Sequence, residues 1–81
     1  MGGRVNAMKF TYDNKADAAF IQLVDRIDFG EAVRSDACDV DLSRSSILLS
    51  FDADDRLLVI EILGASRLLR TETLEIKGSV R

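Results

Sequence analysis

The sequence predicts a single α+β domain: a small antiparallel β-meander of four or five strands with one short helix near the carboxyl end. Short apolar or alternating segments are separated by turns rich in aspartate and serine, and the chain contains no proline. Apolar residues make up 47% of its 81 residues and charged residues 31%, which is typical of a packed domain. A domain of this size buries only roughly 60 to 65% of its unfolded surface, so we expect modest stability unless a second copy covers more of it.

The first predicted unit is a hairpin. In residues 9–12, Phe10 and Tyr12 alternate with polar residues, and residues 18–24 are apolar and aromatic enough to form the partner strand. The intervening "DNKAD" has turn chemistry, because Asp and Asn side chains bond to nearby backbone.

The boundaries of the domain follow from this hairpin. Residues 1–7 are expected to be a disordered leader, residues 8–77 the domain and residues 78–81 a tail.

The middle of the chain carries a weaker pattern. Residues 25–30 are largely polar and end in Gly30, so we expect a loop there. Residues 31–42 alternate weakly and are predicted to contain a strand, and "SRSS" at 43–46 forms the next turn.

The clearest prediction is a second hairpin of two apolar strands, at residues 47–51 and 57–63. The five-residue "DADDR" between them has the length of a hairpin loop that includes one left-handed residue. Asp55 is the expected left-handed position, where glycine would cost less by on the order of 1 kcal/mol. Replacing Asp55 with glycine is therefore expected to stabilise the fold.

The strand at 57–63 is apolar on both faces. Leu58, Ile60 and Ile62 point to one side, and Glu61 shares the other side with Leu57, Val59 and Leu63. A helix or a second subunit must therefore cover the sheet.

Residues 64–79 offer that helix. Ser66 is the expected N-cap, the helix is expected to end near Thr71, and Leu74 with Ile76 alternate as a possible last strand.

Charge and hydropathy exclude two classes of partner. Residues 36–61 hold seven acidic and two basic side chains, a net charge of −5 that repels phosphate backbones, so nucleic-acid binding is not expected. The sequence contains no run of 18 apolar residues, the length needed to span a membrane. This predicts a soluble, cytoplasmic protein.

The residue types also exclude mechanisms. The chain has no histidine and one cysteine, so a histidine-dependent triad, a zinc site and an internal disulfide cannot be built. Cys38 is expected to pack as a small, inert, partly buried hydrophobe. We expect neither a cofactor nor a metal ion. We also expect a protein without catalytic residues rather than an enzyme.

The acidic turn could suggest a calcium loop. Asp52 and Asp54 match the first two ligand positions of an EF-hand, but Arg56 occupies the fifth, glycine is absent from the sixth and Leu63 occupies the twelfth. A solvated turn is therefore the favoured interpretation.

Paired carboxylates are a second possibility, because Asp13 with Asp17 could act as acid and base, but turn aspartates rarely have the required pKa. Glu61 is the more unusual carboxylate, since it interrupts an apolar strand. It is expected either to pair with a cation such as Arg56 or Arg67, which we favour, or to contact a partner, or to take part in catalysis.

Two stretches, "MKFTYDNKADAAFIQL" at 8–23 and "FDADDRLLVIEILGAS" at 51–66, resemble the small bacterial domain-of-unknown-function 2283 family. Members of that family usually carry glycine at the positions of Asp55 and Val59, where this chain departs from the pattern. The matching positions include Tyr12, Asp13, Ala16, Asp17, Ala18, Asp52, Arg56, Glu61, Ile62 and Ser66.

The resemblance implies an α+β meander without an assigned activity. Genes for such domains are sometimes found beside small toxin-like proteins, which implies an antitoxin-like partner role. The leading functional prediction is a non-enzymatic module for protein interaction that forms a homodimer through an apolar sheet face, with a small protein as a possible further partner.

The alternative is a small ligand-binding protein or hydrolase that uses Glu61 and the acidic residues of the first hairpin. The candidate interaction or ligand residues are Tyr12, Asp13, Asp17, Arg56, Glu61 and Ser66.

Overall fold

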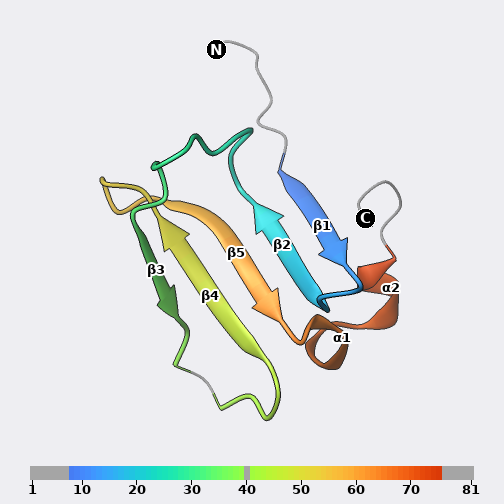
Figure 1. Cartoon of the computed structure of the whole chain (residues 1–81). Coiled ribbons are helices and arrows are strands. Elements are labelled where there is room, and N and C mark those ends of the chain that lie inside the picture. Colours follow the sequence, from blue (N-terminus) through green and yellow to red (C-terminus); the bar gives the residue numbers. More distant parts are fainter. Residues whose placement is uncertain (1–7, 40, 76–81) are drawn as a thin grey trace.

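A computed structural model describes residues 8–39 and 41–75 (Figure 1). Within these ranges the chain forms five strands followed by two short helices, as the α+β prediction requires. The elements are β1 (Lys9–Asp13), β2 (Ala18–Gln22), β3 (Arg34–Ala37), β4 (Ser46–Phe51), β5 (Leu57–Leu63), α1 (Ala65–Leu68) and α2 (Thr71–Leu74).

The strands form one antiparallel sheet with the order β1-β2-β5-β4-β3. Two hairpins, β1–β2 and β4–β5, are joined by the pairing of β2 with β5, so the longest strand lies at the centre. The chain leaves β2 and crosses to the opposite edge to form β3. The sheet therefore has β1 and β3 as its edge strands.

The strand register assigns each side chain to one of two faces, because residues that pair across strands point to the same side. We call the side that packs against the helices the helix face. Its apolar members are Phe10, Tyr12, Ala19, Ile21, Ile47, Leu49, Phe51, Leu58, Ile60 and Ile62.

We call the other side the open face. Its apolar members are Ala18, Phe20, Ala37, Leu48, Leu57, Val59 and Leu63, and Glu61 lies among them. Ala18 is buried, at 3% exposed.

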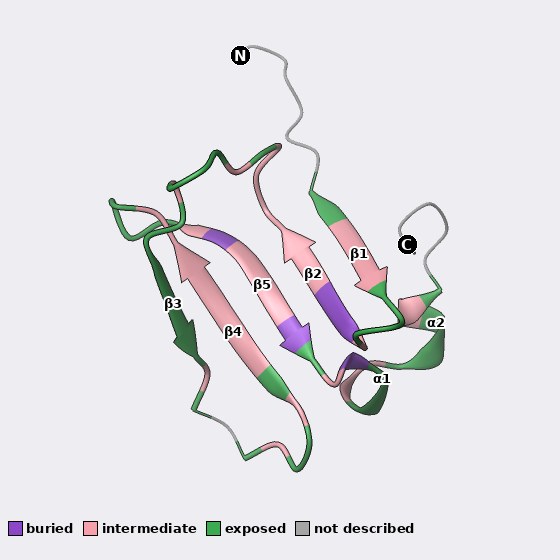
Figure 2. Cartoon of the chain, viewed as in Figure 1, coloured by how far each residue is buried: buried purple, intermediate pink, exposed green. Residues whose placement is uncertain are grey.

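The core lies on the helix face. Ala19, Ile62 and Ala65 are at most 5% exposed, and Leu68, Leu69 and Leu74 pack against them from the helical segment. Alanine at two of these three positions lets the backbone of α1 approach the sheet closely. Figure 2 shows how little of the described chain is fully buried, since most of the strands are coloured as intermediate.

The carboxyl-terminal segment differs from its prediction. Ser66 is not an N-cap: Gly64, with φ of 68°, occupies that position and Ser66 lies inside α1. A break at Arg70, whose backbone is extended, separates α1 from α2. Leu74 lies in α2 rather than in a strand, because its side chain reaches the core.

Several predictions lie outside the described residues, namely those for Ile76, for the leader at 1–7 and for the tail at 78–81. None of the helices in residues 8–39 and 41–75 has the length and hydropathy needed to cross a membrane.

Candidate functional site

Asp17 joins the first hairpin to the start of α1. Its Oδ1 accepts a hydrogen bond from the Tyr12 hydroxyl at 2.7 Å and one from the Ser66 amide at 2.9 Å. The Ser66 hydroxyl donates to Asp17 Oδ2 at 2.8 Å, and the Ala65 amide donates to the Asp17 carbonyl at 2.9 Å. The first amides of α1 are thus capped by a residue 49 positions earlier in the chain. We call Tyr12, Asp17, Ala65 and Ser66 the helix clamp.

The hairpin turn holds Asp17 in this position. Asp13 Oδ1 accepts hydrogen bonds from the amides of Lys15 and Ala16, at 3.1 and 3.4 Å, as an Asx turn does. Asp17 then adopts a left-handed backbone with φ of 53°, which aspartate tolerates better than most residues.

The helix clamp is poorly suited to acid–base catalysis. Hydrogen bonds from Tyr12 and then Ser66 lower the pKa of Asp17 below its ordinary value of 3.8, despite an opposing effect of desolvation. The hydrogen bond to Asp17 raises the pKa of Tyr12 above its ordinary value of 10.0. Both groups are shifted away from neutrality, whereas an efficient general acid or base has a pKa near the working pH. The geometry therefore supports a structural role.

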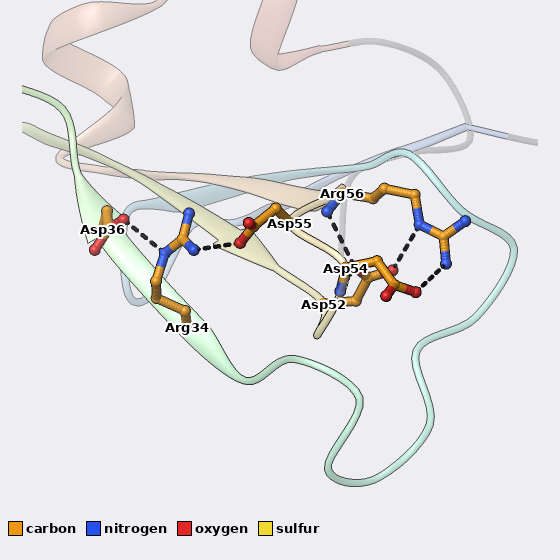
Figure 3. A network of polar contacts seen from close by, with 6 residues as sticks. All are labelled: Arg34, Asp36, Asp52, Asp54, Asp55 and Arg56. Atoms are coloured by element: carbon orange, nitrogen blue, oxygen red, sulfur yellow. Dashed lines mark hydrogen bonds and ion pairs between the residues drawn. The ribbon is translucent and has the colours of Figure 1, made fainter.

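The acidic turn between β4 and β5 is also built from internal contacts (Figure 3). Asp52 Oδ1 accepts hydrogen bonds from the amides of Asp54 and Arg56 at 2.8 and 3.0 Å. The Arg56 guanidinium contacts Asp52 Oδ2 at 3.2 Å and Asp54 Oδ2 at 3.1 Å. The backbone hydrogen bond from Arg56 is the main cause that lowers the pKa of Asp52. The predicted turn is confirmed, with Arg56 as its cation.

Asp55 occupies the left-handed position that the sequence predicted, with φ of 63°. Its carboxylate contacts Arg34 Nη1 of β3 at 2.6 Å, and Arg34 Nε contacts Asp36 at 2.9 Å. The Arg34 guanidinium also lies 4.3 Å from the centroid of the Phe51 ring. Sequence reasoning missed Arg34, because its contact with Asp55 spans 21 residues and depends on the pairing of β3 with β4.

The cost of this left-handed residue can be measured by comparing Asp55→Gly with Asp55→Ala. Both substitutions remove the contact with Arg34, so their difference isolates the backbone. We expect the glycine variant to be more stable by about 1 kcal/mol, or roughly 4 to 8 °C in melting temperature, because alanine at positive φ is strained. Thermal unfolding followed by circular dichroism would check this, and equal melting temperatures would contradict it.

Glu61 lies on the open face, between Phe20 of β2 and Leu48 of β4. Across residues 8–39 and 41–75, no side chain forms a hydrogen bond or ion pair with its carboxylate. The expected pairing with Arg56 or Arg67 is therefore wrong for the described chain. Arg56 is engaged by the acidic turn, and the charge of Arg67 acts on Asp17 near the helix clamp.

Lys9 is a cation of the open face that the sequence analysis did not single out. It pairs in register with Gln22 of β2, which aligns with Val59 of β5. Lys9 Nζ donates to the Asp25 carbonyl at 3.0 Å, and Gln22 Nε2 donates to the same oxygen at 3.1 Å. Only its alternation with Phe10 and Tyr12, which lie on the helix face, could have placed Lys9 on this face.

The six candidate residues thus do not form one site. Tyr12, Asp17 and Ser66 come together in the helix clamp, with Asp13 in the adjoining turn. Arg56 lies in the acidic turn, and Glu61 lies on the opposite face of the sheet from Tyr12. In the described part of the chain, no three potential ligands group as a metal site and no pocket is present.

Comparison with known proteins supports the family assignment made from the two signature stretches. A family model described as a protein of unknown function (DUF2283) matches residues 9–66. No curated protein and no solved structure matches the chain. The family match runs from the start of β1 into α1, so it includes the sheet and all residues of the helix clamp. The chain belongs to the DUF2283 family.

Proposed function

We propose that the protein is a non-enzymatic interaction module that forms a homodimer, with the open face of one copy packed on the open face of the other. The observation that carries this proposal is the composition of that face. Phe20, Leu48 and Val59 are partly exposed, and Leu63 is 38% exposed. The described helices place their apolar side chains on the helix face, so they do not shield these residues.

Packing of two sheets is the arrangement that such a face favours. Sheets stack face to face about 10 Å apart, with the apolar side chains of both interdigitated between them. A second copy offers a matching surface of the same shape, which is the usual basis of an isologous dimer.

The area of the face sets the strength that we expect. Five strands spaced about 4.8 Å apart and about 17 Å long present on the order of 400 Å² of flat surface per copy. Two copies would bury at most on the order of 800 Å² in total, which is below the standard size of stable interfaces and typical of weak, transient ones. The dimer should therefore dissociate on dilution through the micromolar range.

The alternative function, ligand binding or hydrolysis, is less well supported. It requires Glu61 to act with Tyr12, Asp13 and Asp17, whereas the sheet separates Glu61 from Tyr12. The carboxylate of Asp17 is already engaged by three donors from the chain itself. A small protein partner, such as the toxin that the family resemblance implies, would bind in addition to the second copy.

Sedimentation equilibrium tests the dimer. At high concentration the wild-type protein is expected at about 18 kDa, twice the 9.0 kDa chain. Phe20→Ser should raise the dimer Kd at least tenfold, because two phenyl rings per dimer lose their burial, each worth about 1.5–3 kcal/mol.

Phe29→Ser is the matched control, since Phe29 is fully exposed in the β2–β3 connection, outside the strands that form the open face. It should dimerise as the wild type does. A wild-type protein that remains at 9.0 kDa at millimolar concentration would refute the proposal.

A further inference from the structure

The charges on the open face have an unusual arrangement. Among the described strand residues, Lys9 is the one cation that the register places on this face, because Arg34 lies on the helix face beside Phe51. Two carboxylates share the open face. Asp13, at the end of β1, is engaged with the amides of the hairpin turn, which leaves Glu61 as the acceptor that the described chain does not pair.

Lys9 and Glu61 are too far apart to pair within one chain. Strand β2 lies between β1 and β5, which separates their backbones by about 10 Å across the sheet. Lys9 aligns with Val59 through Gln22, so Glu61 also lies two residues, or about 7 Å, farther along the strands. The structure agrees, because Lys9 Nζ bonds to a backbone carbonyl instead.

We propose that Lys9 of each copy pairs with Glu61 of the second copy, with the two-fold axis of the dimer running along β2. This inference rests on the homodimer proposed above and specifies its geometry. An axis along β2 stacks β1, β2 and β5 of one copy on β5, β2 and β1 of the other, because β1 and β5 flank β2, and it leaves β4 and β3 outside the overlap. Rotation about this axis leaves positions along the strands unchanged, so Lys9 and the Glu61 of the second copy stay offset by about 7 Å along the strands. The two long side chains lean toward each other across that offset within the layer between the sheets, and the symmetry creates the contact twice.

The alternative axis is disfavoured by the same charges. An axis along the central strand β5 would place β5 over its own copy and bring the two Glu61 carboxylates together in an apolar layer. Like charges that are removed from water repel strongly, and each would lack a partner. The Lys9–Glu61 pair thus favours the axis along β2 over the axis along β5. Its main effect is on the geometry and specificity of the dimer, since a buried ion pair often adds little net affinity.

Charge reversal with subunit mixing tests this arrangement. Lys9→Glu alone and Glu61→Lys alone each create two like-charge contacts per homodimer, and we expect each to raise the dimer Kd at least tenfold. An equimolar mixture of the two variants restores both opposite-charge contacts. With one variant labelled with ¹⁵N, native mass spectrometry should show a predominant heterodimer with a Kd within about threefold of the wild type.

Two further variants guard against misfolding and nonspecific charge effects. Lys9→Glu combined with Glu61→Lys in one chain reverses both pairs and should restore the homodimer. Lys15→Glu changes the net charge as Lys9→Glu does, but in the β1–β2 turn, outside the strands that form the open face. It should dimerise as the wild type does.

The possible results separate the two proposals. A wild-type dimer whose single variants also dimerise normally, or a mixture that gives the statistical 1:2:1 ratio, would overturn the Lys9–Glu61 pairing and leave the homodimer intact. A wild type, mixture and double variant that all remain monomeric at millimolar concentration would overturn the homodimer and the pairing together.

Discussion

Replacing Gly64 with alanine is expected to reduce the free energy of unfolding by about 2 to 4 kcal/mol, the first of the two large effects that we expect. Gly64 has φ of 68°, where an alanine is strained by about 1 kcal/mol. A Cβ there would also lie 2.6 Å from the Arg44 carbonyl and 2.9 Å from Ser45 Oγ. The backbone must shift to relieve that overlap, and overpacking of this kind typically costs 1–3 kcal/mol.

Gly30→Ala is the matched control for this prediction. Gly30 also has positive φ, 83°, but a Cβ there would meet no atom within 4 Å. The free energy of unfolding of Gly30→Ala should therefore fall only by the cost of the strained backbone, about 1 kcal/mol. Chemical denaturation of both variants measures the difference, and equal losses would show that the close approach of Gly64 to the β3–β4 connection is not maintained in solution.

Asp17→Ala is expected to lower the melting temperature by roughly 10 °C or more, the second large effect. The substitution removes the acceptor of three hydrogen bonds, which leaves the Ser66 amide uncapped and the Tyr12 hydroxyl without its partner. Asp55→Ala is the control, because it places alanine at a similar positive φ of 63° in an exposed turn. The excess loss in Asp17→Ala measures the helix clamp, and equal losses would contradict its structural role.

The contribution of Asp17 should also depend on pH. Its folded-state pKa is lowered from 3.8, so the carboxylate stabilises the fold fully above the unfolded pKa and loses that effect as the pH falls below it. The difference in melting temperature between the wild type and Asp17→Ala should therefore shrink below about pH 3.8. Asp52 also has a lowered pKa and is present in both proteins, so the difference between them isolates Asp17.

Local patterns were sufficient to predict the sheet. Alternation and turn chemistry identified both hairpins, and the strand predicted at 57–63 has the bounds of β5. The spacing within "DADDR" placed Asp55 in its left-handed conformation. Each of these features depends on residues that are close in the chain, where steric and hydrogen-bonding preferences act directly.

The errors arose where distant segments meet. Ser66 has the chemistry of an N-cap, but Asp17, 49 residues away, supplies the acceptor and Ser66 donates to it. Arg56 and Arg67 are suitable cations for Glu61 by residue type. The fold commits Arg56 to the acidic turn and places Arg67 near Asp17 instead. These outcomes depend on strand order, which a single sequence does not specify.

Substitutions on the two faces of the sheet are expected to have different effects. The helix face builds the core and is fixed by the helix clamp, so substitutions there should change stability. The open face adds little to that core, and substitutions at Phe20, Lys9 or Glu61 should change association while the fold is retained. Under the proposed homodimer, this separation makes stability and association independently measurable in the same set of variants.

The most direct test of the homodimer is an isotope-filtered NOE experiment on a dimer assembled from labelled and unlabelled chains. It detects only contacts between copies. We expect cross-peaks between the Phe20 ring of one copy and methyl groups of Val59 or Leu63 of the other, since these residues lie on the open face of β2 and β5, the strands that the proposed axis stacks. Intermolecular cross-peaks confined to other surfaces, or none at millimolar concentration, would contradict the proposal that the open face is the dimer interface.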